Sequence, residues 1–184
     1  MHTPDNNQEI LRVIDNNGKW NGKYLSRKEA STIPGILFNT AFVWLYNKQT
    51  NSVLFEIRSL NKKYNPGKYG LVGGHVEKDD SIDETIYKEV FEEIGIDIKD
   101  KKITLLGIAQ PCGVYRSFAY NYICFCDMDI EKVKIQKNEL EGVKYIPYQQ
   151  VKEEVLNNSD KYSITKERYS DIFKEIDKVL SKNQ

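Results

Sequence analysis

The chain has 184 residues, of which 40% are apolar; this suffices for one hydrophobic core, whereas two full domains would be cramped. Its 27 Lys and Arg residues balance its 27 Asp and Glu residues, which excludes a strong global attraction to nucleic acid or to an anionic membrane surface. The longest apolar run, at residues 41–46, is about six residues long and far too short to span a membrane. We therefore expect one domain over residues 1–184, with neither a nucleic-acid polymer nor a membrane as its partner.

The cysteines indicate a reducing compartment. Cys112, Cys124 and Cys126 contain no C-x-x-C pair and their number is odd, and because the N-terminus is polar we expect no secretory leader. These observations favour reduced thiols in a cytoplasmic protein. We expect the three side chains to pack in the core.

The N-terminal part is predicted to form a β-hairpin over residues 9–25. Apolar character alternates in residues 9–15 and 19–25, and Asn16-Asn17-Gly18 between them has the chemistry of a tight turn. Residues 26–34 are expected to form a connector. The core is then expected to extend from about residue 36 to about residue 157.

Two paired central strands are predicted next. Residues 36–46 are rich in β-branched and aromatic side chains, and residues 52–58 resume alternation after a polar turn. The basic stretch 59–69 contains the turn signal Asn65-Pro66-Gly67. Residues 70–72 are expected to form a short strand that leads directly into a helix.

The helix has signals at both of its ends. Ser81 and Glu84 match a capping box at its start, and Gly95 suits the C-terminal cap. Between these caps runs an apolar stripe, made of Ile86, Val90 and Ile94. One edge of the helix should therefore dock onto the sheet, and the other edge should face a cleft.

The C-terminal half is predicted to add strands and then helices. Strands are expected at residues 103–111, 117–128 and 143–146, with a turn at Cys112-Gly113. Pro147 suits the first position of a helix that ends near residue 156, and an amphipathic helix covers about residues 165–182. This order predicts an α+β fold in which a mixed sheet lies between helices.

Three acidic side chains crowd one surface of the predicted helix. Glu89, Glu92 and Glu93 occupy positions i, i+3 and i+4, so their carboxylates project from neighbouring parts of that surface. Charge runs of this kind usually just face water. Packed closely in a cleft they repel each other, and Mg²⁺ or Mn²⁺, which prefer oxygen ligands, would neutralise them.

The wider spacing is more specific. From Gly74 the pattern continues with Asp80, then Lys88-Glu89, then Glu92-Glu93 and finally Gly95 followed by an apolar residue. It closely resembles the Nudix box, the signature of hydrolases that cleave a diphosphate attached to a further moiety. This chain differs by having Asp80 where the family has Glu and Lys88 where it has Arg.

The Nudix resemblance implies an α/β/α sandwich and a metal-dependent diphosphate hydrolase. It implies that Glu89, Glu92, Glu93 and the carbonyl of Gly73 hold Mg²⁺ or Mn²⁺. It also implies that Glu89 and Glu93 serve in catalysis, with Lys88 orienting Glu89. Family members often draw the general base from a loop outside the box, where Glu139 and Glu141 are the local candidates here, although a solvated loop is an equal alternative.

A cluster of basic residues precedes the box and is expected to bind a small-molecule diphosphate substrate, although any one of these side chains alone could be solvated surface. With the turn residues that follow, the substrate-binding candidates are Arg58, Lys62, Lys63, Lys68, Gly74 and His75. A lone histidine in a turn is otherwise most often a structural hydrogen-bonding group.

Two other functions remain open on the same fold. The stretch 44–75 is similar to isopentenyl-diphosphate isomerase, but that enzyme needs a cysteine where this chain has Gly73 and several histidines on its metal, and only two histidines are present. A catalytically silent module that binds a nucleotide is the second alternative. The chain is expected to be a monomer or a homodimer.

Overall fold

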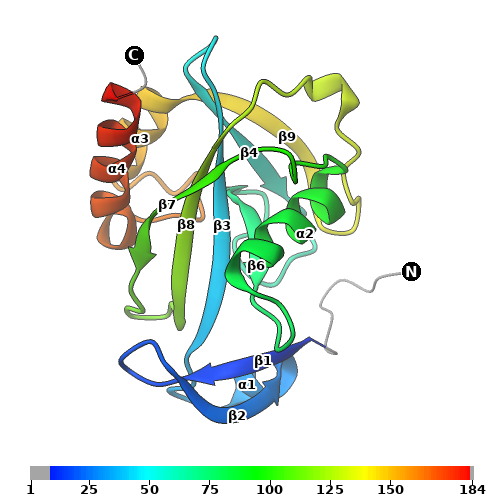
Figure 1. Cartoon of the computed structure of the whole chain (residues 1–184), viewed down its shortest axis with the longest axis vertical. Helices are drawn as coiled ribbons and strands as arrows, with labels where there is room; N and C mark the ends of the chain where they lie inside the picture. Colours follow the sequence, from blue (N-terminus) through cyan, green and yellow to red (C-terminus); the bar gives the residue numbers. More distant parts are fainter. Residues whose placement is uncertain (1–8, 183–184) are drawn as a thin grey trace.

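The computed structural model describes residues 9–182 and has a seven-stranded mixed sheet between two helical layers (Figure 1). The elements in chain order are β1 (Ile10–Ile14), β2 (Trp20–Ser26), α1 (Arg27–Thr32), β3 (Phe38–Asn47), β4 (Ser52–Arg58), β5 (Tyr69–Gly70), β6 (Val72–His75), α2 (Ile82–Ile94), β7 (Ile103–Ala109), β8 (Ser117–Phe125), the 3₁₀ helix η1 (Ile130–Lys132), β9 (Leu140–Pro147), α3 (Tyr148–Leu156) and α4 (Lys166–Ser181). None of the described helices is both long enough and apolar enough to cross a membrane.

β3 organises the sheet. One edge of β3 pairs with β8 in parallel over residues 38–46. The other edge is shared, because β6 pairs with residues 40–43 and β4 pairs with residues 45–47, both in antiparallel fashion. β4 therefore diverges from β3, and the glycine-rich strand β6 lies in the space that β4 leaves.

Alternation along the strands divides the core between the two faces of the sheet. On one face, Val43 and Leu45 of β3 pack with the stripe of α2 formed by Ile86, Val90 and Ile94. On the other face, Trp44 packs with α3 and α4, and its ring lies 5.6 Å from that of Phe173. These contacts confirm the α/β/α arrangement and the predicted apolar stripe.

The predicted N-terminal hairpin is confirmed as β1 and β2, which form a separate two-stranded sheet. It packs at the end of β3, where the Ile14 amide donates to the Leu37 carbonyl at 2.8 Å. β1 also contacts the segment between β6 and α2, since the Lys78 amide donates to the Ile10 carbonyl at 2.8 Å. The hairpin is thus joined to the segment in which the acidic motif begins.

The caps of α2 also agree with the prediction. Ser81 accepts from the Glu84 amide while the Glu84 carboxylate accepts from the Ser81 amide, and Gly95 ends the helix with a left-handed φ of 70°. These local signals fix both ends of the helix that carries the motif.

Three local expectations were wrong. Residues 26–34 contain α1 rather than only a connector, because Ser26 and Glu29 form a second capping box. Pro147 is the N-cap of α3 and not its first helical residue. Cys112 is exposed in the turn after β7, whereas Cys124 and Cys126 are buried, and all three are free thiols.

Candidate active site

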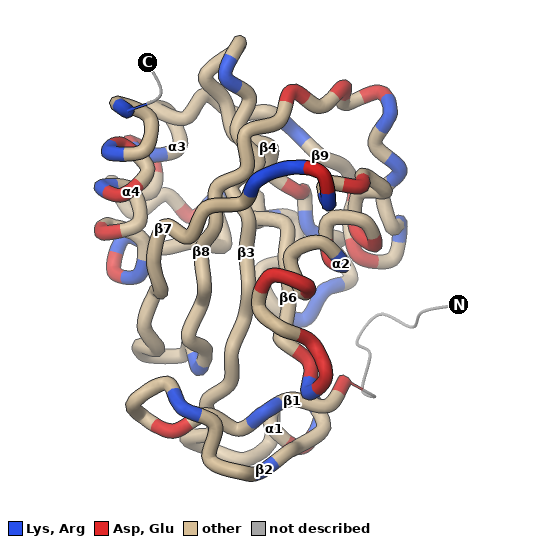
Figure 2. Tube along the Cα trace, viewed as in Figure 1, with Lys and Arg blue, Asp and Glu red and all other residues tan. Residues whose placement is uncertain are grey.

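The turn between β6 and α2 brings strand backbone against the acidic helix. The Gly73 amide donates to Glu93 Oε2 at 3.2 Å. A Cβ atom on Gly73, whose φ is 146°, would lie 2.1 Å from the Ala41 carbonyl oxygen, and one on Gly74 would lie 2.2 Å from Glu89 Oε1. Gly74 therefore makes room for Glu89, whereas Gly73 is required by the close pairing of β6 with β3. Figure 2 shows acidic segments along α2, which lies beside β6.

A further carboxylate, which the sequence reasoning missed, comes from β4. The Glu56 side chain is only 2% exposed, and Arg58 Nη1 donates to its Oε1 at 3.1 Å. A Cβ on Gly70 would lie 2.6 Å from the same oxygen, so the absence of a side chain there makes room for Glu56. The available signal was an acid inside the otherwise apolar run SVLFEIR.

These carboxyl groups disfavour one another's ionisation. Burial raises the pKa of Glu89 to about 8, and the negative charges of Glu9 and Glu92 add to the effect. Burial also raises the pKa of Glu93 well above its ordinary value, with the charge of Glu56 as the next cause. The pKa of Glu56 is itself raised by burial, although Arg58 acts in the opposite direction. The site is thus short of positive charge.

The donor chemistry suits a hard divalent cation, because the converging groups are carboxylate oxygens, one of them a buried Glu56 Oε2 without a hydrogen-bond partner. Among residues 9–182, however, no three His, Cys, Asp or Glu side chains already form a metal-binding arrangement. The residues present fit such an ion by chemistry, and its binding would require the carboxylates to close around it.

The other motif residues lie on the outer side of α2. Glu92 is exposed and lines a hollow of about 440 Å³ that Asp80 and Lys88 also line. The Lys88 ammonium donates to Glu77 at 2.5 Å and to Asp80 at 3.3 Å, and makes no hydrogen bond to Glu89 within the described residues. The expected contact through which Lys88 would orient Glu89 is therefore not formed. The two departures from the Nudix pattern instead pair with each other.

The N-terminal hairpin brings a second unexpected acid to the site. Glu9 Oε2 lies 3.4 Å from His75 Nδ1, and Glu9 Oε1 accepts from Arg27 Nη1 at 3.0 Å. Burial raises the pKa of Glu9, but His75 and Arg27 outweigh it and hold the pKa below its ordinary value. No sequence signal marked Glu9, because its partners are brought to it only by the packing of the hairpin.

Some basic side chains of β4 and of the loop before β5 lie at the site, and others lie on the surface. Arg58 contacts Glu56, and Lys62 forms an ion pair with Glu139, so both cations lie against acids of β4 or of the segment just before β9. Lys63 is exposed, with its ammonium 5.3 Å from the centre of the Tyr64 ring. Lys68 is half-buried beside β5.

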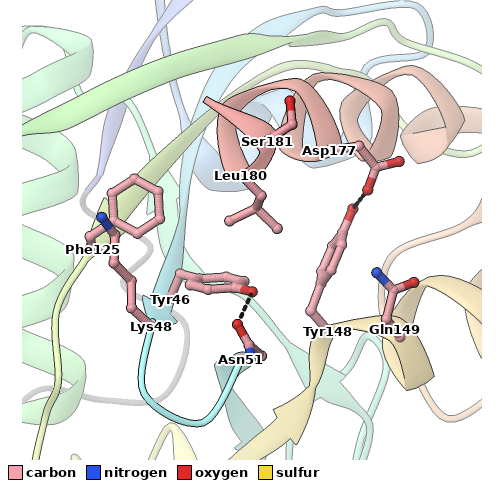
Figure 3. A pocket seen from close by; sticks show the side chains of 9 residues that line it. All are labelled: Tyr46, Lys48, Asn51, Phe125, Tyr148, Gln149, Asp177, Leu180 and Ser181. Carbon is pink, nitrogen blue, oxygen red and sulfur yellow. Dashed lines mark hydrogen bonds between the residues drawn. The ribbon is translucent and has the colours of Figure 1, made fainter. Parts of the chain in front are cut away.

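A hollow of about 480 Å³ lies on the other face of the sheet, between the end of β3 and α4 (Figure 3). Its polar walls are already paired: Tyr148 donates to Asp177 at 2.8 Å, and Tyr46 Oη lies 3.3 Å from Asn51 Oδ1. The Lys48 ammonium lies over the Phe125 ring at 4.3 Å. The hollow contains none of the motif residues, so the candidate site is the one at β6 and α2.

A model of the NUDIX domain family matches residues 37–166. Nudix hydrolase 3 of Arabidopsis thaliana is 25% identical over 153 residues, which cover 78% of this chain and 20% of that protein. NAD-capped RNA hydrolase NudC of Mannheimia succiniciproducens is 32% identical over 82 residues, which cover 45% of this chain and 29% of that protein. The matched stretches thus span less than a third of either relative.

Solved structures show the same fold. DR0079 from Deinococcus radiodurans has a TM-score of 0.66 at 19% identity, with 81% of this chain and 90% of that chain covered. The NUDIX domain of Shewanella oneidensis NrtR, complexed with ADP ribose, has a TM-score of 0.58 at 18% identity, with coverages of 85% and 99%. At these identities the likeness concerns the fold alone.

Proposed function

The chain belongs to the NUDIX domain family, and from this premise we propose that it hydrolyses the diphosphate linkage of a nucleoside-diphosphate derivative with the help of Mg²⁺ or Mn²⁺. The observation that carries the proposal is the set of carboxyl groups around β6, where burial raises the pKa of Glu89 to about 8 and raises that of Glu93 as well. An anionic cleft of this kind binds a diphosphate only if cations are supplied.

Glu89 and Glu93, with the Gly73 carbonyl and Glu92, are the proposed cation ligands. The hydrogen bond from the Gly73 amide holds Glu93 Oε2 at 3.2 Å and so restricts the orientation of that carboxylate. A bound divalent cation would neutralise the diphosphate oxygens and acidify a water molecule. Lys88 is proposed to support the site indirectly, since its partners Glu77 and Asp80 belong to the segment that leads into α2.

The remaining roles belong to the basic loop and its acidic neighbour. Glu139 is the proposed general base, and its ion pair with Lys62 fixes its position beside the loop. Arg58, Lys62, Lys63 and Lys68, with Gly74 and His75, are the proposed contacts to the substrate phosphates. Cytoplasmic location and a monomeric or homodimeric state remain expectations.

The proposal is tested by a substrate panel with Mg²⁺ or Mn²⁺. NudC is named for NAD-capped RNA and the NrtR domain was solved with ADP ribose, so the panel includes ADP-ribose and NAD together with nucleoside triphosphates and nucleotide sugars. Phosphate, diphosphate and nucleoside monophosphate are measured separately, which identifies the bond that is cut. Binding of ADP-ribose without turnover of any compound would instead favour the catalytically silent module.

Glu93→Gln provides the matched variant for this panel. It removes the charge but keeps the size of the side chain, so we expect activity to fall more than about 100-fold while circular dichroism shows a folded protein. Full activity of this variant at saturating metal would refute the role of the acidic helix.

Isomerisation of isopentenyl diphosphate is not expected. The position that would need a thiol is Gly73, and a Cβ there would lie 2.1 Å from the Ala41 carbonyl oxygen, so this backbone leaves no room for a cysteine. Appearance of dimethylallyl diphosphate in the same panel would contradict the assignment to hydrolysis.

A further inference from the structure

Glu56 is an acidic side chain in a place where an acid is costly. It lies on β4 between Phe55, which is fully buried, and Ile57, which is partly buried, and its own side chain is 2% exposed. A carboxylate removed from water is unfavourable unless each of its oxygens is paired. Its position within a central strand, rather than at the end of one, therefore calls for a specific partner.

Only one of its two oxygens has such a partner. Oε1 accepts from Arg58 Nη1 at 3.1 Å and occupies the space left by the missing side chain of Gly70. Oε2 is buried and has no hydrogen-bond partner within the described residues. A purely structural ion pair with Arg58 would not explain why the second oxygen is left in this state.

The carboxyl group of Glu56 lies beside the acidic helix. The Glu56 and Glu93 side chains lie within hydrogen-bonding distance of each other, so without a cation the two carboxyl groups can share a proton. β4 and α2 thus direct carboxylates at the same small volume from two different elements. Two carboxylates that face each other in this way either share a proton or hold a cation between them.

We infer that Glu56 is a further ligand of the divalent cation, which it contacts through Oε2 from the side of the sheet, opposite the helix ligands Glu89 and Glu93. Arg58 and the space at Gly70 hold Oε1 and thereby direct Oε2 at the ion. This inference rests on the proposed function for the presence of the cation, and it adds a strand ligand that lies outside the Nudix box. Oxygen ligands from strand and helix together suit Mg²⁺ or Mn²⁺.

Direct binding of Mn²⁺ to the full chain, measured by electron paramagnetic resonance and by calorimetry without substrate, tests the inference. Glu56→Gln keeps the shape of the side chain and an oxygen for Arg58, but it removes the charge. We expect its Mn²⁺ dissociation constant to rise at least as much as the roughly 10- to 100-fold change seen when a group that supports a metal ligand is removed. Glu153→Gln, an exposed position on α3, loses the same charge and should bind Mn²⁺ like the wild type.

Thermal unfolding separates loss of a ligand from loss of the fold. Glu56→Gln relieves the repulsion with Glu93, so without metal it should melt at the same or a higher temperature than the wild type, and Mn²⁺ should raise its melting temperature less. Should Glu56→Gln fail to fold, Glu56→Asp, which keeps the charge but withdraws it by one methylene, replaces it and should also bind Mn²⁺ more weakly. An unchanged Mn²⁺ affinity in the folded variant would overturn the inference.

The outcome for Glu56 and the outcome for the proposed function can be told apart. If the wild type binds Mn²⁺ but cleaves no compound of the panel, the proposed hydrolysis fails, while the affinity of Glu56→Gln still decides the role of Glu56. If the wild type does not bind Mn²⁺ at millimolar concentration, the inference is overturned.

Discussion

At the scale of single residues, we expect replacement by alanine to have different effects at the two glycines of β6: one change should weaken metal binding and the other should destabilise the fold. In Gly74→Ala the new Cβ meets the end of the Glu89 side chain, 2.2 Å away, which can move. In Gly73→Ala it meets the Ala41 carbonyl oxygen, 2.1 Å away, at a φ of 146° that alanine rarely adopts. The first change should therefore displace a proposed metal ligand, and the second should strain the sheet.

We expect Gly74→Ala to weaken Mn²⁺ binding by roughly tenfold or more with little change in melting temperature, and Gly73→Ala to lower the free energy of unfolding by roughly 2–4 kcal/mol. Calorimetric titration with Mn²⁺ and urea unfolding of both variants measure these effects. Wild-type Mn²⁺ affinity in Gly74→Ala would show that Glu89 does not need its present position.

The residues that sequence alone identified are those whose partners lie close in the chain. Ser81 with Glu84 and the helix acids Glu89 and Glu93 follow fixed spacings within one helix, and such spacings are visible in a single sequence. Glu56 meets Glu93 only after β4 and α2 pack on the same sheet, so its role could not be predicted from spacing. The same reason explains Lys88, whose partner Glu77 lies in the irregular segment before the helix.

At the scale of elements, α3 is joined to the strand that precedes the site. Glu154 of α3 accepts from Lys161 Nζ at 2.9 Å and from Tyr162 Oη at 2.7 Å. The loop that carries these residues pairs with β5, since the Tyr69 amide donates to the Lys161 carbonyl at 2.8 Å. Tyr162 is buried, and its ring lies 5.6 Å from that of Tyr69. Glu154 thus helps to hold the loop against β5.

This connection predicts a pH-dependent stability. The hydrogen bonds from Lys161 and Tyr162 lower the pKa of Glu154 to about 2. The Glu154 carboxylate therefore stabilises the fold fully at pH values above 4.5, the ordinary carboxyl pKa. This stabilisation is lost as the pH falls toward 2. Glu154→Gln should cost about 1 kcal/mol at pH 6, with solvent screening included. Urea unfolding from pH 6 to pH 2.5 should show the difference from wild type shrinking, and a constant difference would contradict this linkage.

The elements themselves were predictable where they carry a long apolar pattern. β3, β4, α2 and α4 follow alternation or helical periodicity, which tertiary packing then uses. α1 and η1 are short and have little apolar pattern, so their caps at Ser26 and Asp129 are their main signals. The sequence also could not predict that β4 and β6 share one edge of β3, because the pairing of strands depends on which of them can reach that edge in the folded chain.

At the scale of the whole molecule, the N-terminal hairpin lies before the stretch that matches the family model, and it is a separate two-stranded sheet. It nevertheless contributes Glu9 to the site. Two hydrogen bonds also join it to the segment before α2. The Lys78 amide donates to the Ile10 carbonyl, and the Arg12 guanidinium donates to the Lys78 carbonyl. These contacts favour a single folding unit over residues 9–182 rather than a core with an independent appendage.

The positions of the two tryptophans allow a test of whether residues 9–182 fold as a single unit. Trp20 lies in the hairpin and Trp44 in the buried core, so Trp44 alone reports on the core in a Trp20→Phe background. Leu11→Ala in that background removes a side chain that is 1% exposed on β1 and should cost about 2–5 kcal/mol. If the chain is one cooperative unit, this loss shifts the unfolding midpoint that Trp44 fluorescence reports, and the midpoint from far-ultraviolet circular dichroism shifts with it.

Leu60→Ala, at a side chain that is 71% exposed, should leave both midpoints unchanged. An unshifted Trp44 midpoint, with an earlier separate transition in circular dichroism, would show that the hairpin folds on its own and that Glu9 reaches the site only when it docks.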